Sequence, residues 1–95
     1  MTLEEILKSG NYLLIDVREP MELEMDGEIS TAINIPLGEV EERKDEILNS
    51  DKPVVIFCRS GNRSGKALDF LNHEGLKNGY NGGGWADLKH KMENL

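Results

Sequence analysis

The chain has 95 residues, of which 38% are hydrophobic and 31% charged, and this length provides one compact core but not two. We therefore expect a single domain over residues 1–95. The formal net charge of −7 argues against a nucleic-acid partner, because a phosphate backbone binds to a positive surface. The longest apolar run near the N-terminus, residues 12–17, is far too short to cross a bilayer, so we expect a soluble, cytoplasmic protein with no membrane partner.

Helix and strand patterns alternate in the first half of the chain. Thr2 and Glu5 have the spacing of a capping box and Gly10 is a stop signal, which predicts a short helix between them. Residues 12–17 form a continuously apolar run, which predicts a strand that ends at Asp16 and is covered on both faces. Further patterns predict a helix over residues 19–25, a strand over residues 32–35 and a charged helix over residues 39–48.

The second half continues the alternation. Residues 54–57 are the most β-branched run of the chain and predict a strand with Cys58 at its C-terminal edge. A helix is expected from Asn62 or Arg63 to about His73, followed by a weak strand near residues 77–81 and a helix over residues 85–92. Together the elements predict an α/β fold, in which a small parallel sheet of about four strands is flanked by helices on both faces.

Cysteine and histidine usage limits the chemistry. The only cysteine, Cys58, has no partner for an internal disulfide. His73 and His90 lack the spacing of metal ligands and lie in polar helical stretches, so we expect them on the surface. The sequence therefore predicts no metal and no cofactor. Trp85, near the start of the last predicted helix, is interpreted as a packing residue.

The negative charge is unevenly distributed. Residues 1–51 hold 14 acidic and 4 basic side chains, whereas residues 52–95 hold 4 acidic and 7 basic ones. The basic half contains Cys58, and the stretch from Cys58 to Lys66 has three basic side chains and no acidic one. This local positive charge favours a small anion as ligand. The acidic half is either a docking face for a partner or a solvated surface.

The segment after Cys58 favours a reactive thiol. It must turn from the end of a strand into a helix, and Ser60, Gly61 and Asn62 tolerate the tight backbone that such a turn needs. Main-chain N–H groups of this turn and of the helix start would point at the sulfur and lower the pKa of the thiol. Arg59 and Arg63 would add positive charge, and Ser64 would add a hydrogen bond from its hydroxyl. The alternative is an inert buried thiol.

Residues 58–64, Cys-Arg-Ser-Gly-Asn-Arg-Ser, resemble the active-site loop of rhodanese-like single-domain sulfurtransferases. Residues 14–19 are similar to the first motif of that family and residues 27–36 to its second, although Glu28, Ser30 and Thr31 replace the usual His, Pro and Gly. The segment from Gly79 to Leu88 only approximates the family's Gly-Gly pair. Asp16, Arg18 and Glu19 are interpreted as a structural network of ion pairs and turns.

The resemblance implies a thiosulfate sulfurtransferase that carries sulfur as a persulfide on Cys58, with thiosulfate or a similar anion as donor and with cyanide, a small thiol or a thiol protein as acceptor. The substrate-binding loop would consist of Arg59, Ser60, Gly61, Asn62, Arg63 and Ser64. Two alternatives remain: a cysteine-dependent phosphatase or arsenate reductase, and a non-catalytic binding or sulfur-relay module. Phosphatases of that kind resemble one another in having five residues between the cysteine and the arginine, whereas four separate Cys58 from Arg63.

Overall fold

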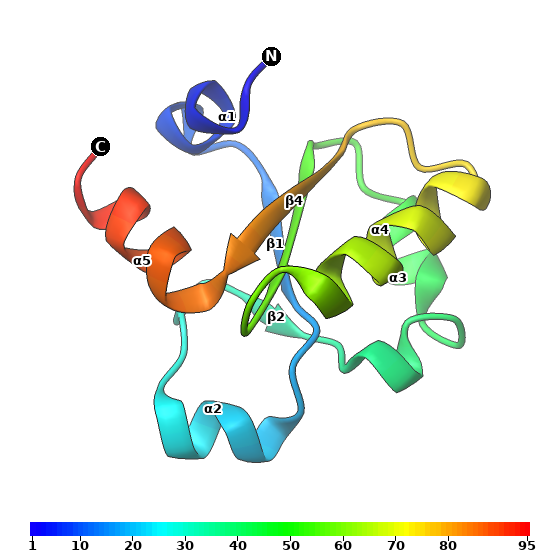
Figure 1. The fold of residues 1–95 in the computed structure, drawn as a ribbon. Helices are drawn as coiled ribbons and strands as arrows, with labels where there is room; N and C mark the ends of the chain where they lie inside the picture. The colour runs from blue at the N-terminus through cyan, green and yellow to red at the C-terminus, as the bar shows by residue number, and fades with distance from the viewer.

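The core of the molecule is one sheet of four parallel strands, arranged in the order β2-β1-β3-β4 (Figure 1). The structure, a computed structural model, describes residues 1–95. The strands are β1 (Leu13–Asp16), β2 (Ile33–Asn34), β3 (Val54–Cys58) and β4 (Gly79–Gly84). The predicted parallel α/β sheet is therefore confirmed, and the C-terminal ends of all four strands meet at one edge.

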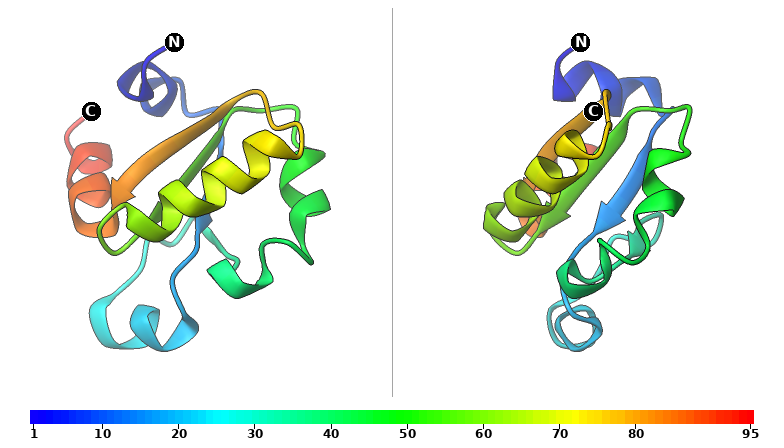
Figure 2. Two further views of the ribbon diagram at one scale, coloured as in Figure 1. Left: turned by 45° about the vertical axis from the view of Figure 1, so that its right-hand side comes forward. Right: turned by 90° about the vertical axis from the view of Figure 1, so that its right-hand side faces the viewer.

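Helices cover both faces of this sheet. In the views of Figures 1 and 2, α1 and α5 lie on one face and α3 and α4 on the other, while α2 lies beyond the C-terminal ends of the strands. The helices are α1 (Leu3–Ser9), α2 (Pro20–Asp26), α3 (Lys44–Leu48), α4 (Asn62–His73) and α5 (Trp85–Glu93), with a 3-10 turn η1 (Leu37–Glu39). None of the helices is both long and apolar enough to pass through a membrane.

Strand β3 shows why its sequence is continuously apolar. All five of its residues are buried. Val54, Ile56 and Cys58 belong to the core under α3 and α4, whereas Val55 and Phe57 belong to the core under α1 and α5. Because successive side chains of a strand point to opposite faces, a strand covered on both sides needs an apolar residue at every position.

Two predicted elements differ from the observed ones. Strand β4 begins and ends later than predicted, and it carries a bulge where Ile56 pairs with Asn81 but Phe57 pairs with Gly83. Its glycine-rich sequence has little strand propensity, so pairing with β3 decides where it forms. The helix predicted over residues 39–48 is broken into η1, turns and the short helix α3, because packing rather than local propensity determines such short segments.

Candidate active site

Cys58 is the last residue of β3 and lies where the strand turns into α4. The turn passes through Gly61, whose φ of +96° is in the left-handed region that favours glycine. A Cβ at this position would also stand 3.3 Å from the Cα of Gly83. The turn therefore needs glycine, and it brings the first main-chain N–H groups of α4 back toward the cysteine.

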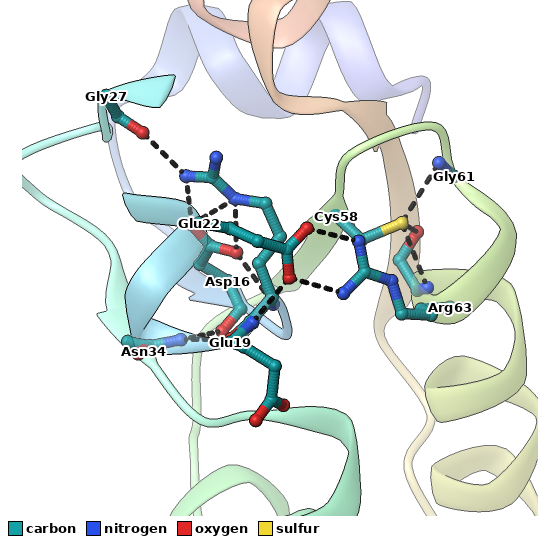
Figure 3. Close-up of polar contacts among 10 residues, drawn as sticks. Asp16, Glu19, Glu22, Gly27, Asn34, Cys58, Gly61 and Arg63 are labelled. Carbon is teal, nitrogen blue, oxygen red and sulfur yellow. Dashed lines mark hydrogen bonds and ion pairs between the residues drawn. The ribbon is translucent and has the colours of Figure 1, made fainter. Parts of the chain in front are cut away.

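The sulfur of Cys58 is surrounded by three hydrogen-bonding groups of this turn (Figure 3). The main-chain N–H of Gly61 donates to Sγ at 3.0 Å, and that of Ser64 at 3.4 Å. The Ser64 hydroxyl lies 3.5 Å from Sγ, and either atom can be the donor. These contacts form the cradle that the sequence predicts.

The Cys58 side chain is also fully buried, with 0% of its surface exposed. Burial has the largest single effect and raises the pKa of the thiol. Hydrogen bonds from the Ser64 side chain and from the main chain of Ser64, Ser60 and Gly61 lower this pKa, and their combined effect exceeds that of burial. The net result is a pKa below the usual value of the thiol. Neither of the two surface pockets of the molecule is lined by residues 58–64.

Asn81 of β4 is hydrogen-bonded to the turn that follows Cys58. Its Oδ1 accepts the hydroxyl proton of Ser64 at 2.7 Å and the main-chain N–H of Gly83 at 2.9 Å. Its Nδ2 donates to the carbonyl of Gly61 at 3.1 Å. One amide side chain therefore binds both residues, Gly61 and Ser64, that contact the sulfur.

Strand β4 also lies very close to the loop. A Cβ on Gly84 would come within 2.8 Å of the carbonyl oxygen of Arg59, a distance that real Cβ atoms essentially never show. The glycine-rich sequence of β4 thus allows the backbone of this strand to approach the candidate active-site loop, residues 58–64.

An ion pair connects the loop to α2. The two terminal nitrogens of Arg63 each donate to one oxygen of the Glu22 carboxylate at 2.7 Å (Figure 3). The Arg63 hydrogen bonds, more than any other contact, lower the pKa of Glu22 to about 2. Glu22 Oε2 also accepts the main-chain N–H of Glu19 at 2.8 Å. Both members of the pair keep some solvent exposure, 31% for Arg63 and 24% for Glu22.

A second ion pair lies inside the protein next to this site. The Arg18 guanidinium contacts the Asp16 carboxylate at 2.8 Å and donates to the carbonyl of Gly27 at 3.0 Å, while its carbon lies 4.8 Å from the centroid of the Trp85 ring. Asp16 and Arg18 are both buried. The predicted structural ion pair is confirmed, and Trp85 packs against it.

Comparison with known proteins decides the family. The profile of the family described as Rhodanese-like domain matches residues 2–91. The chain belongs to this family. In this rhodanese-like domain, Cys58 ends strand β3 and the turn that follows it leads into α4.

Individual relatives agree. The chain is 48% identical over 80 residues to the uncharacterized protein YqhL of Bacillus subtilis, covering 82% of this chain but only 62% of that protein. It is 36% identical over 75 residues to the thiosulfate sulfurtransferase PspE of Escherichia coli, covering 78% of this chain and 71% of that protein. The crystal structure of a rhodanese-related protein from Thermoplasma volcanium superposes with a TM-score of 0.72 at 39% identity and covers 97% of this chain and 85% of that chain. The chain is thus a sulfurtransferase-family domain.

The structure distributes the predicted loop residues between two environments. Gly61 and Ser64 contact the sulfur, whereas Arg59, Ser60 and Asn62 are exposed. Arg63, predicted to bind substrate, is held by Glu22. Both histidines are exposed, as expected. No group of three His, Cys, Asp or Glu side chains forms a metal site.

Sequence reasoning missed Glu22 and Asn81. Glu22 lies in a helix whose acidic residues all look equally solvated, and 41 residues separate it from Arg63. Asn81 lies in the segment from Gly79 to Leu88, which only approximates the family pattern. The strand predicted near residues 77–81 did not indicate how this segment pairs with β3. The one available signal for Asn81 was the cluster of glycines around it, which indicates close backbone approach.

Proposed function

We propose that this rhodanese-like domain is a sulfurtransferase that takes sulfane sulfur from thiosulfate or a similar donor and works through a Cys58 persulfide. The observation that carries the proposal is the cradle of two main-chain N–H groups and one hydroxyl around a cysteine sulfur at the C-terminal edge of the sheet. Such a cradle stabilises negative charge on sulfur, which the reaction needs twice: on the attacking thiolate and on the terminal sulfur of the persulfide. The name of PspE supports the choice of thiosulfate as donor.

The reaction consists of two half-reactions. In the first, the Cys58 thiolate attacks the outer sulfur of thiosulfate, a new S–S bond forms, and the bond to the sulfonate breaks to release sulfite. In the second, a thiol or cyanide attacks the terminal sulfur and regenerates the thiolate. The lowered pKa of Cys58 favours the thiolate, so the first step proceeds from the thiolate without a separate general base. The exposed cation Arg59 is the group available to hold the sulfonate.

The phosphatase alternative is disfavoured by the loop. Four residues separate Cys58 from Arg63, so the cradle accommodates a single sulfur atom rather than a tetrahedral oxyanion. In addition, Arg63 is already paired with Glu22. Turnover of an aryl phosphate at a rate comparable with sulfur transfer would overturn this choice.

Intact-mass measurement after exposure to thiosulfate tests the proposal. We expect the protein to gain one sulfur atom, and the gain to be absent after alkylation of Cys58 and in a Cys58→Ser variant. Addition of cyanide should return the original mass and produce thiocyanate. A wild-type protein that never gains sulfur, or a Cys58→Ser variant that transfers it at the wild-type rate, would exclude this mechanism.

A further inference from the structure

The ion pair between Arg63 and Glu22 changes the charge that a donor meets at the active site. The loop has two arginines, but only Arg59 is exposed and without a carboxylate partner. Arg63 directs both terminal nitrogens at the two oxygens of Glu22, as Figure 3 shows beside Cys58. The positive charge of Arg63 is therefore compensated before any donor arrives.

The Glu22 member of the pair is charged over a wide pH range. Because the pKa of Glu22 is about 2, its carboxylate stays charged at any moderate pH. Glu22 is also held within its own helix start, since Oε2, which accepts from Arg63, accepts the main-chain N–H of Glu19 as well. An anion that binds to Arg63 must displace a carboxylate that is part of the fold, and it must do so next to a negatively charged neighbour.

Sulfur donors differ in whether they need to displace Glu22 from Arg63. Thiosulfate is a dianion, and its leaving group, sulfite, keeps both negative charges when the S–S bond breaks. An alkyl persulfide is attacked at its outer sulfur by the Cys58 thiolate; the S–S bond breaks, the proton remains on the transferred sulfur, and one alkyl thiolate leaves. Only the first donor brings a sulfonate that needs an arginine.

We propose that Glu22 is a specificity-determining residue, which occupies the anion-binding side of Arg63 and so favours sulfane donors without a second anionic group, such as alkyl persulfides, over thiosulfate. This inference rests on the proposed function and narrows its donor class. Glu22 acts here through Arg63 and takes no part in bond breaking, so its effect is on the choice of donor.

The test compares how fast two donors load Cys58 with sulfur. Intact-mass measurement of quenched samples gives a second-order rate constant for loading by thiosulfate and another for loading by 2-hydroxyethyl persulfide. In Glu22→Gln the side-chain oxygen that accepts the Glu19 N–H is kept and the charge is lost. We expect the ratio of the thiosulfate constant to the persulfide constant to rise about threefold to fivefold, the upper part of the range for a partly exposed ion pair.

Two further variants make the result decisive. In Glu22→Gln the amide oxygen could still accept a hydrogen bond from Arg63. Glu22→Ala removes this acceptor too, and it should raise the ratio of the two rate constants by the same factor. Glu19→Gln removes one charge from the same helix start at an exposed residue with no ion pair, and its ratio should stay within twofold of wild type. An unchanged or lower ratio in both Glu22 variants, or an equal rise in Glu19→Gln, overturns the inference. A wild-type protein that neither donor loads contradicts the proposed function instead.

Discussion

The side-chain oxygen of Asn81 accepts the hydroxyl proton of Ser64 at 2.7 Å, and the same hydroxyl oxygen lies 3.5 Å from the sulfur of Cys58. A serine hydroxyl has a single proton. While that proton is directed at Asn81, the hydroxyl can only accept from the Cys58 thiol; when the thiol loses its proton, the hydroxyl can turn and donate to the thiolate. The protonation state of Cys58 is thus coupled to the contact between β4 and α4.

Removal of the Ser64 hydroxyl should make the thiol less acidic. In Ser64→Ala the main-chain N–H groups remain, but the hydrogen bond that most strongly lowers the pKa of Cys58 is lost. We expect alkylation by iodoacetamide at neutral pH to slow about threefold to tenfold, with the midpoint of its pH profile moved to higher pH. Ser30→Ala, at an exposed serine, is the control. An unchanged profile in Ser64→Ala would contradict the assignment.

Asn81 should act as a positioning residue for the loop. Asn81→Ala removes the acceptor of the Ser64 hydroxyl and the donor to the Gly61 carbonyl, so the cradle loses its support from β4. Sulfur loading from thiosulfate should slow about tenfold, while the free energy of unfolding falls by only about 1 kcal/mol. Asn78→Ala, at the exposed asparagine before β4, should change neither quantity. Equal loading rates in the two variants would exclude a positioning role.

A methyl group on Gly84 should displace the active-site loop. The new Cβ in Gly84→Ala would stand 2.8 Å from the Arg59 carbonyl oxygen, and this backbone atom can yield only if the loop moves. We expect about 1–3 kcal/mol lower stability in urea titrations and at least a tenfold slower sulfur loading. Gly38→Ala, where no atom lies within 4 Å of the added Cβ, is the matched control. Wild-type loading by Gly84→Ala would show that the loop tolerates the shift.

The pair between Glu22 and Arg63 should contribute stability that depends on pH. The pKa of Glu22 is about 2 in the folded protein and near 4.5 in the unfolded chain, so its contribution is complete above pH 4.5 and is lost as the pH falls through 2. We expect about 1 kcal/mol, because the pair is partly open to solvent. Urea titrations of wild type and Glu22→Gln should differ by this amount at pH 6 and converge near pH 2. A difference that does not depend on pH would refute the linkage.

The buried pair of Asp16 and Arg18 should be much more sensitive to loss of one partner. Arg18→Met leaves the Asp16 carboxylate buried without its cation, which we expect to lower the free energy of unfolding by about 3–5 kcal/mol. The double variant Asp16→Asn with Arg18→Met should recover part of that loss, because it removes the unpaired charge. If the double variant is less stable than Arg18→Met alone, the unpaired Asp16 charge is not the cause of the lost stability.

Local patterns were sufficient for most of the fold. Burial on both faces requires strand β3 to be apolar at every position, and the capping residues Thr2 and Gly10 mark the ends of α1, so these elements were predicted with nearly correct bounds. The position of β4 was predicted wrongly, because its residues Gly79–Gly84 have no strand pattern and take their register from pairing with β3.

The candidate active site also has one part that follows from local sequence and one part that follows from tertiary contacts. The sequence by itself determined Cys58 and its turn, because a strand end, a left-handed glycine and a helix start are local features that direct N–H groups at one atom. Only the tertiary structure decided that Arg63 is paired with Glu22 and that Asn81 holds Ser64, since these contacts join segments 41 and 17 residues apart. Their strength depends on distance and burial, which are properties of the folded chain rather than of any stretch of sequence.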